Sequence, residues 1–275
     1  MQTWKDFTLR PDARIGVLGL ASDENSSFQR GAAEAPPLIR AAFLSPSTNQ
    51  WSENGTDLGA GGLFVDAGDL RPTPQRDIFA DIEEAIGRLL AHDLKPLSLG
   101  GDHAVTAPIV KAMAAKHPKL SILHFDAHPD LYDCFEGNAR SHASPFARIM
   151  EAGWAQRLVQ VGIRTLNGHQ KEQAARFGVE IVEMKNWRDD LALDFETPLY
   201  ISFDMDCLDP AFAPGISHWE PGGFSTRQVL RVIQSLRAPL VGADVVEFNP
   251  RVEARITAMV AAKVFKELAA KMLER

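Results

Sequence analysis

The chain has 275 residues, of which 45% are hydrophobic and 24% are charged, and its formal net charge is -7. These values are ordinary for a globular protein with one large domain, and they exclude the clustered Lys and Arg surface of a nucleic-acid-binding protein. The two cysteines exclude a disulfide framework, and no apolar run is long enough to span a membrane. Because the residues before position 14 also lack the apolar stretch of a signal peptide, we expect a cytoplasmic protein.

Short apolar runs alternate with helical patterns along the chain. Most of the runs are continuous, which is typical of strands covered on both faces of a parallel sheet. The alternation predicts a single α/β domain over 1–275 with α/β/α layers. In chain order, we expect a strand over 14–20, a helix over 75–92, a strand over 95–101, a helix over 104–117, a strand over 120–126, a helix over 143–152, a strand over 157–163, a helix over 168–177, a strand over 198–206, a helix opened by the capping box Ser225–Gln228, a strand over 239–248 and a helix over 254–273.

Three of the expected strands end in acidic and histidine residues. In open α/β sheets, chemistry gathers at the carboxyl ends of the strands. Alternate residues of an extended chain point to one side, so we expect positions 126, 128 and 130 to converge, and likewise positions 204 and 206. The six side chains at these strand ends are His103, Asp126, His128, Asp130, Asp204 and Asp206.

These six side chains supply carboxylates and imidazoles without sulfur. Such a set suits Mn²⁺, and less distinctively Fe²⁺, Co²⁺, Ni²⁺ or Zn²⁺. Grouped carboxylates raise one another's pKa, so grouping them without a cation would be unfavourable. A lone Asp-x-Asp is usually a turn, and His103 alone could be a buried core residue. Three such groups at three strand ends nevertheless favour a binuclear metal site.

Three longer motifs carry these residues: GGDHA (100–104), DAHPD (126–130) and SFDMDCLDPAFAPG (202–215). In this order they resemble the signatures of the ureohydrolases, the family of arginases, agmatinases and related amidinohydrolases. The segments CFEGNARSHASPFARIM (134–150) and GADVVEFNP (242–250) are most similar to plant-type arginases. The resemblance covers nearly the whole chain and implies a mainly parallel eight-stranded sheet between helical layers.

The resemblance also implies a role for each ligand. Asp126 and Asp204 would bridge two metals. The resemblance further implies two Mn²⁺ per subunit, with Ni²⁺, Co²⁺ or Fe²⁺ as alternatives, and a homo-oligomer that is a trimer or hexamer. One metal would be held by His103, Asp126, Asp130 and Asp204, and the other by Asp126, His128, Asp204 and Asp206.

Two further residues match catalytic positions of the family: His142 matches its acid/base histidine, and Glu247 matches the acid that binds the guanidinium. A guanidinium is cationic and a poor electrophile, so its attack needs a water activated by metals. Glu247 can pair with the cation, Asp130 can relay a proton, and His142 can exchange one with solvent.

The far end of the substrate is where candidate substrates differ. The loop 131–141 leads into His142, and within it Asn138 and Ser141 are candidates for binding a carboxylate. These positions are otherwise ordinary solvated loop residues. Trp219 stands where the plant-type pattern has a smaller aliphatic residue. It could shorten the pocket, stack on a guanidinium or pack between subunits.

We therefore expect hydrolysis of a small guanidino compound with release of urea, most naturally arginine to ornithine. The alternatives are an agmatinase, which converts agmatine to putrescine, and a hydrolase of another guanidino acid or of guanidine. A two-metal phosphoesterase is disfavoured because Glu247 would repel a phosphate. A non-catalytic metal-binding subunit is disfavoured because His142 and Glu247 are both present.

Overall fold

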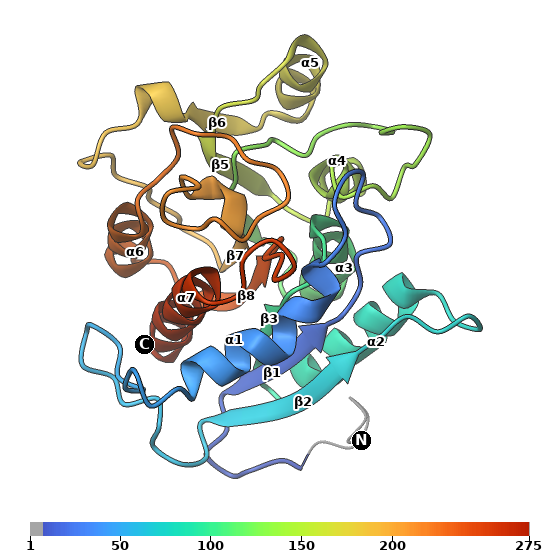
Figure 1. Cartoon of the computed structure of the whole chain (residues 1–275). Coiled ribbons are helices and arrows are strands. Elements are labelled where there is room, and N and C mark those ends of the chain that lie inside the picture. Colours follow the sequence, from blue (N-terminus) through green and yellow to red (C-terminus); the bar gives the residue numbers. More distant parts are fainter. Residues whose placement is uncertain (1–7, 275) are drawn as a thin grey trace.

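Eight parallel strands form one sheet through the middle of the computed structural model, which describes residues 8–274 (Figure 1). The strand order is β2-β1-β3-β8-β7-β4-β5-β6, and every neighbouring pair is parallel. The last strand of the chain, β8, lies between β3 and β7, so both halves of the sequence build the centre of the sheet. The strands are β1 Ile15–Leu20, β2 Phe64–Leu70, β3 Lys95–Leu99, β4 Ser121–Phe125, β5 Arg157–Ile163, β6 Glu180–Glu183, β7 Leu199–Asp204 and β8 Leu240–Val246.

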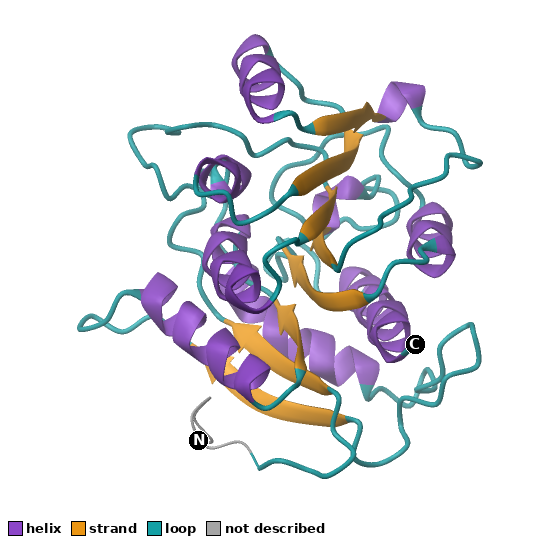
Figure 2. Cartoon of the chain, turned by 180° about the vertical axis from the view of Figure 1, so that it is seen from behind, coloured by secondary structure: helices purple, strands orange, loops and turns teal. Residues whose placement is uncertain are grey.

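Helices cover both faces of this sheet, which gives the expected three-layer α/β/α arrangement (Figure 2). One layer consists of α1, α6 and α7, and α7 contacts the other two. The second layer consists of α2, α3, α4 and α5, each in contact with the next. The α-helices are α1 Ala35–Phe43, α2 Ile78–Ala91, α3 Thr106–Lys116, α4 Pro145–Glu151, α5 Gly168–Phe177, α6 Thr226–Ser235 and α7 Ile256–Leu273. Short 3-10 helices are η1 Ala32–Glu34, η2 His103–Val105, η3 Met184–Asn186 and η4 Met205–Cys207.

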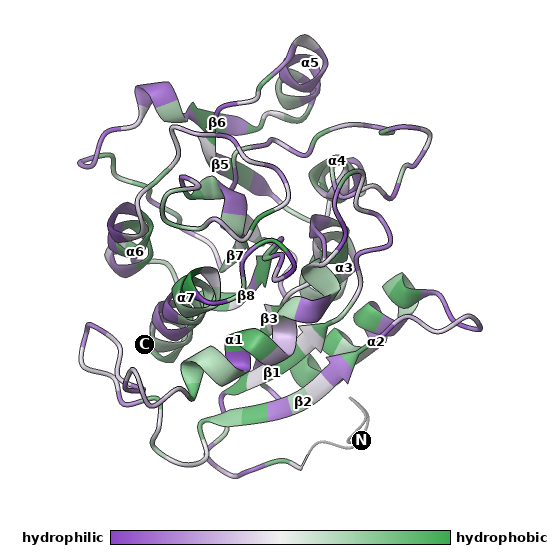
Figure 3. Cartoon of the chain, in the orientation of Figure 1, coloured by the Kyte–Doolittle hydropathy of each residue, from purple (hydrophilic) through white to green (hydrophobic). Residues whose placement is uncertain are grey.

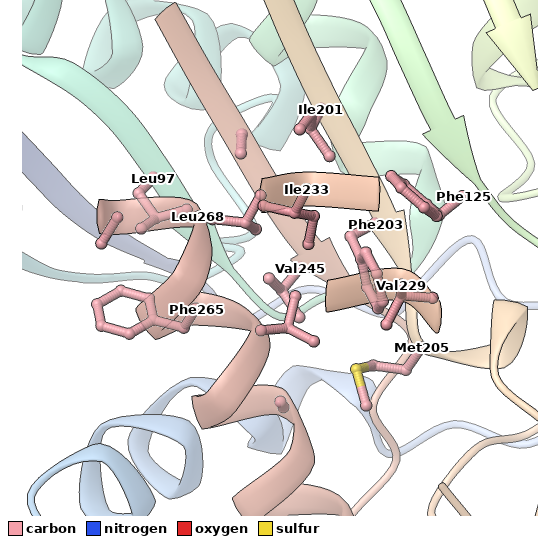
Figure 4. Packing of buried hydrophobic residues seen from close by; sticks show 14 of the residues in the cluster. Leu97, Phe125, Ile201, Phe203, Met205, Val229, Ile233, Val245, Phe265 and Leu268 are labelled. Carbon is pink, nitrogen blue, oxygen red and sulfur yellow. The ribbon is translucent and has the colours of Figure 1, made fainter. Parts of the chain in front are cut away.

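Alternate residues of the central strands fill two hydrophobic clusters, one on each face of the sheet. Figure 4 shows the cluster beneath α6 and α7, where Phe203 of β7 and Val245 of β8 lie close to Val229, Ile233 and Leu268. Full burial of such a side chain contributes about 1.5–3 kcal/mol. In Figure 3, hydrophobic and hydrophilic colours alternate along helices such as α6 and α7, as expected of helices that cover a sheet on one side. The strands therefore end at the edge of a densely packed hydrophobic core.

The six strands expected from apolar runs are confirmed, and so is the capping box, in which Ser225 and Gln228 exchange hydrogen bonds. The two strands that the runs did not predict, β2 and β6, lie at the two edges of the sheet. Edge strands are partly exposed, so neither shows a continuous apolar run. Helix α1 was also not predicted. Its first turn contains Pro36 and Pro37, which is permitted because the N–H groups there have no intrahelical partner.

Candidate metal centre and pocket

Four neighbouring strands, β3, β8, β7 and β4, end at one edge of the sheet, and residues with reactive side chains follow each of them. His103 lies in η2 shortly after β3, and Glu247 directly follows β8. Asp204 is the last residue of β7, and Asp206 lies in η4 just beyond it. The DAHPD segment (126–130) follows β4. Because the carboxyl ends of parallel strands share an edge, these side chains meet in one place.

Tight turns, rather than extended chain, bring the acidic residues together. Strand β4 ends at Phe125 and β7 ends at Asp204, so the expected extended conformation of 126–130 and 204–206 is wrong. Asp126 Oδ1 accepts a hydrogen bond of 2.6 Å from the backbone N–H of His128. Asp204 Oδ1 accepts one of 2.8 Å from the backbone N–H of Asp206. Each aspartate thus stabilises the turn that presents the next ligand.

Left-handed backbone conformations position three of the predicted site residues. Gly101 has a φ of 86° just before His103, and a Cβ at Gly101 would lie 2.8 Å from a backbone carbonyl oxygen of β1. Asp130 and Glu247 have φ values of 51° and 61°. This conformation costs a residue with a Cβ on the order of 1 kcal/mol or more, so the surrounding structure must hold both acids in place.

The imidazole of His103 faces three carboxylates. Its Nδ1 lies 3.1 Å from one oxygen of each of Asp126, Asp130 and Asp204. His103 is fully buried, and despite these distances its Nδ1 makes no well-aligned hydrogen bond to any residue that the structure describes. An imidazole nitrogen and three carboxylate oxygens around one point form a donor set that fits a divalent cation.

His128 belongs to a second group of the same kind. Its Nδ1 lies 3.0 Å from Asp206 Oδ2 and 3.3 Å from Asp126 Oδ1. Asp126 turns its other oxygen, Oδ2, toward His103, so it belongs to both groups. His and Asp side chains here are therefore able to hold metal ions in two adjacent places that share a carboxylate.

The carboxylates crowd one another. Burial, and then the charges of Asp206 and Asp126, raise the pKa of Asp204 well above its usual value. Burial and Asp126 also raise the pKa of Asp206. Burial acts in the same direction on Asp126, but the neighbouring histidines outweigh it and hold the pKa of Asp126 well below its usual value. Buried acids this close together ionise fully only beside added positive charge, which two divalent cations provide.

His142 and Glu247 form a buried pair beside these groups. His142 Nδ1 lies 3.2 Å from Glu247 Oε1, and His142 Nε2 lies 2.8 Å from Ser27 Oγ. Glu247 Oε1 also accepts a hydrogen bond of 2.9 Å from the backbone N–H of His103. Burial would lower the pKa of His142, but Glu247 raises it to about 9. The pKa of Glu247, which burial would raise, is lowered by His142. At neutral pH the two side chains thus form an ion pair.

A pocket of about 220 Å³ opens over the metal-binding groups and this ion pair. Tyr132, Phe135 and His218 form part of its wall, although the sequence patterns did not single them out for this position. The ring of His218 stacks on that of His142, with centroids 5.1 Å apart. His218 belongs to no motif with a regular spacing, so no signal in the sequence indicates that it lines the pocket. The predicted residues that line the pocket are His128, Asp130, His142, Asp204, Asp206 and Glu247.

Three residues predicted to contact substrate are not among the described residues that line this pocket. Asn138 is exposed and donates a hydrogen bond of 3.0 Å to Asn25. The hydroxyl of Ser141 is buried and accepts a hydrogen bond of 3.3 Å from a backbone N–H two residues ahead. Trp219 is 52% exposed, and its indole donates to a backbone carbonyl at 3.2 Å. Each of these residues is held by contacts within the loops around the pocket.

Comparison with known proteins identifies the family. The model of the arginase family matches residues 13–270. The chain belongs to the arginase family. It is 49% identical to the mitochondrial arginase 1 of Arabidopsis thaliana, over 94% of this chain and 81% of that protein. An agmatinase of Bacillus cereus is 32% identical over 87% of this chain and 84% of the agmatinase. Members of the family are binuclear metal hydrolases of the ureohydrolase type.

Solved structures agree with this membership. The arginase of Medicago truncatula has a TM-score of 0.89 at 44% identity, covering 95% of this chain and 88% of that one. A hypothetical agmatinase of Burkholderia thailandensis has a TM-score of 0.84 at 30% identity, covering 98% and 90%. The fold expected from the resemblance is therefore confirmed.

The expectation of a cytoplasmic protein is wrong in the light of these relatives. Similar arginases of Arabidopsis thaliana and rice are named as mitochondrial, and a second Arabidopsis thaliana arginase is named as chloroplastic/mitochondrial. Composition and a low cysteine content do not distinguish the cytoplasm from an organelle interior. Within residues 8–274, no helix is long and apolar enough to cross a membrane.

Proposed function

We propose that this chain hydrolyses arginine to ornithine and urea at a pair of Mn²⁺ ions. The observation that carries the proposal is the Glu247–His142 pair, which faces the carboxylate–histidine groups across one pocket. A carboxylate opposite a metal pair is suited to bind a cationic guanidinium over the activated water. The plant arginases, which are more similar to this chain than the agmatinase of Bacillus cereus, support arginine as the substrate.

The metal ligands follow from the two groups around Asp126. All of their ligand atoms are oxygen or nitrogen, which favours Mn²⁺ while Ni²⁺, Co²⁺ and Fe²⁺ remain chemically acceptable. When bound, two such ions act as Lewis acids and lower the pKa of a shared water. His103, Asp126, Asp130 and Asp204 would hold one ion, and Asp126, His128, Asp204 and Asp206 would hold the other.

The remaining chemistry falls to side chains at the pocket wall. Glu247 would bind the guanidinium through charge-assisted hydrogen bonds and orient its carbon toward the metals. Asp130 would accept the proton of the attacking water, because it lies between His103 and the pocket. His142 would hold the proton that the departing amine needs, since its pKa of about 9 keeps it protonated at neutral pH.

The far end of the substrate is proposed to extend toward the loop 131–141. Tyr132 and Phe135 of this loop line the pocket, which supports that direction. We infer that Asn138 and Ser141 contact the α-carboxylate once substrate is bound. Trp219, the neighbour of His218, would cover the entrance to the pocket.

Urea release from a panel of guanidino compounds tests the activity. The panel consists of arginine, agmatine, 4-guanidinobutyrate and guanidine, each with enzyme loaded with Mn²⁺, Ni²⁺, Co²⁺ or Fe²⁺. We expect the highest kcat/KM for arginine with Mn²⁺. A preference for agmatine would make the chain an agmatinase. No urea from any of the four compounds would refute the proposal.

The substitution Asp126→Asn tests the ligand assignment. Asp126 faces both His103 and His128, so its loss should remove both metal loading and activity. The control is Asp190→Asn, because Asp190 is an exposed acid that is not among the described residues lining the pocket, and its contact to Arg188 is long, at 3.6 Å. Two retained metals per chain with normal turnover in Asp126→Asn would exclude a bridging role.

We also infer a single domain and a homo-oligomer. The interleaved strand order, with β8 between β3 and β7, supports one cooperative unit, which calorimetry would detect as one unfolding transition. The family resemblance supports a trimer or a hexamer. Light scattering should therefore give three or six times the chain mass of 30.2 kDa, and a monomer would contradict this inference.

A further inference from the structure

A row of fully buried polar side chains crosses the middle of the sheet on the side of α3. Its members come from five adjacent strands, β3, β8, β7, β4 and β5. Each member is paired in register with the next. Burying polar groups among apolar strands is unfavourable unless they are hydrogen-bonded, so the row needs an explanation. The polar row consists of Ser98, Asp244, Ser202, His124 and Gln160.

The first set of contacts in the row begins at Asp244, which accepts hydrogen bonds. Its carboxylate accepts hydrogen bonds from Thr106 Oγ1 at 2.9 Å, from the Tyr200 hydroxyl at 2.7 Å and from Ser202 Oγ at 2.8 Å. A serine hydroxyl has a single proton to donate. Because Ser202 gives this proton to Asp244, its oxygen acts as an acceptor toward His103 Nε2, which lies 3.0 Å away.

The contact with Ser202 determines the tautomer of His103. His103 Nε2 must carry the proton that it donates to Ser202, so the lone pair of the neutral ring lies on Nδ1. It is Nδ1 that faces Asp126, Asp130 and Asp204 at 3.1 Å. A metal ligand needs this arrangement, with its free nitrogen toward the ion and its N–H held from behind.

A second set of contacts in the row acts on Asp126. The side-chain nitrogen of Gln160 donates a hydrogen bond of 2.6 Å to the backbone carbonyl of Pro129, and a carbonyl can only accept. The same nitrogen lies 3.0 Å from His124 Nδ1, so Nδ1 accepts and the proton of His124 is on Nε2. His124 Nε2 then donates to Asp126 Oδ2 at 2.7 Å. The ring of Phe146 stacks on His124 with centroids 3.9 Å apart and fixes its plane.

We propose that the polar row is a positioning layer for the metal centre: Asp244 and Ser202 orient His103, and Gln160 and His124 orient Asp126. None of the four residues in these two sets is among the described residues that line the pocket, so they act through the ligands and not on the substrate. The inference rests on the proposed function in one respect, which is that His103 and Asp126 bind metal.

Two substitutions and a matched control test the layer. Ser202→Ala removes the acceptor for His103, and His124→Phe removes the donor to Asp126 while keeping a ring against Phe146. The control is Ser98→Ala, because Ser98 is equally buried in the same row and its hydroxyl has no hydrogen-bond partner among residues 8–274. The ion used is Mn²⁺ alone, without substrate.

The measurement is the Mn²⁺ content of each loaded protein after dialysis against graded chelator, together with the unfolding temperature of the metal-free proteins. Loss of such supporting contacts typically weakens metal binding about 10–100-fold, and we expect this range for Ser202→Ala and His124→Phe. Ser98→Ala should retain Mn²⁺ like the wild type, and the metal-free forms should unfold at similar temperatures.

Equal Mn²⁺ retention in all three variants would overturn the proposal. So would a loss of Mn²⁺ that only accompanies a less stable metal-free fold, because the row would then be purely structural. If Ser202→Ala fails to fold, His124→Phe still tests the second set of contacts. A wild-type chain that holds two Mn²⁺ but releases no urea would refute the proposed function and leave the positioning layer intact. A wild-type chain that holds no Mn²⁺ pair would refute both.

Discussion

His142 Nδ1 lies 3.2 Å from Glu247 Oε1, so the proposed proton donor and the proposed guanidinium ligand are paired with each other before substrate binds. A guanidinium that approaches Glu247 competes with an imidazolium for the same carboxylate. Substrate binding would therefore weaken the hold of Glu247 on His142 and free its proton for the departing amine. In this proposal the pair would couple recognition of the substrate cation to proton supply.

The first prediction concerns the pH dependence of the metal-free fold. The pKa of His142 is raised to about 9 from its usual 6.5 by Glu247. Because the pKa is raised in the folded state, the ion pair contributes its full stabilisation when the pH is below 6.5. This contribution is lost as the pH rises through about 9. The shift corresponds to a free energy on the order of 3 kcal/mol. Chemical denaturation should show wild type more stable than His142→Asn at pH 6, with the difference vanishing near pH 10. A difference that grows with pH would contradict the ion pair.

The second prediction concerns Glu247→Gln, which keeps the shape of the side chain and removes its charge. Loss of a charge-assisted hydrogen bond to the guanidinium should lower kcat/KM for arginine about 100-fold. Both metals should remain bound, because Glu247 faces His142 and a backbone N–H rather than the metal groups. Steady-state kinetics and metal analysis provide the check, with exposed Glu172→Gln on α5 as the control. A change of kcat/KM below about threefold would show that Glu247 does not bind the substrate.

The third prediction concerns Gly101→Ala. At a φ of 86°, an added Cβ would lie 2.8 and 2.9 Å from two backbone carbonyl oxygens. Strain of this kind costs on the order of 1–3 kcal/mol and should also displace His103. The free energy of unfolding and the affinity for Mn²⁺ should both fall. Gly168→Ala is the control, because among the described residues no atom outside its chain neighbours and its own helix backbone lies within 4 Å of its Cβ position. Equal stability of the two variants would show that the backbone at Gly101 is not constrained by these contacts.

The fourth prediction concerns Trp219→Leu, which replaces the exposed indole by an aliphatic side chain. If Trp219 covers the pocket entrance, KM for arginine should rise several-fold while kcat stays within about twofold. The substitution would remove a contact that stabilises the bound substrate and the transition state equally, and it would leave the chemical step unchanged. The same substitution should change the ratio of kcat/KM between arginine and agmatine. Unchanged KM values for both compounds would assign Trp219 to the surface alone.

The centre of the sheet and the convergence of the candidate metal ligands could be predicted from the sequence for the same reason. Strands covered on both faces leave continuous apolar runs, and residues such as Asp126 and Asp204 stand where these runs stop. The edge strands β2 and β6 and the helix α1 could not be predicted, because partial exposure and prolines hide their patterns.

The contacts between strands needed the structure. His124, Ser202 and Asp244 each interrupt an apolar run at one position, but their alignment depends on strand order and register. The left-handed backbone of Glu247 likewise has no signature in its residue type. The loop 131–141 has no periodicity, so the exposure of Asn138 could not be read from the chain.

Urea release from arginine, measured against the number of Mn²⁺ ions added per chain, tests whether the chain is a two-metal arginine hydrolase. The starting material is metal-free protein, and ornithine is measured in the same samples. We expect that activity requires the second equivalent of Mn²⁺ and that urea and ornithine form in equal amounts, because two groups sharing Asp126 would bind the ions. Full activity with a single ion per chain, or no urea from arginine at any loading, would contradict it.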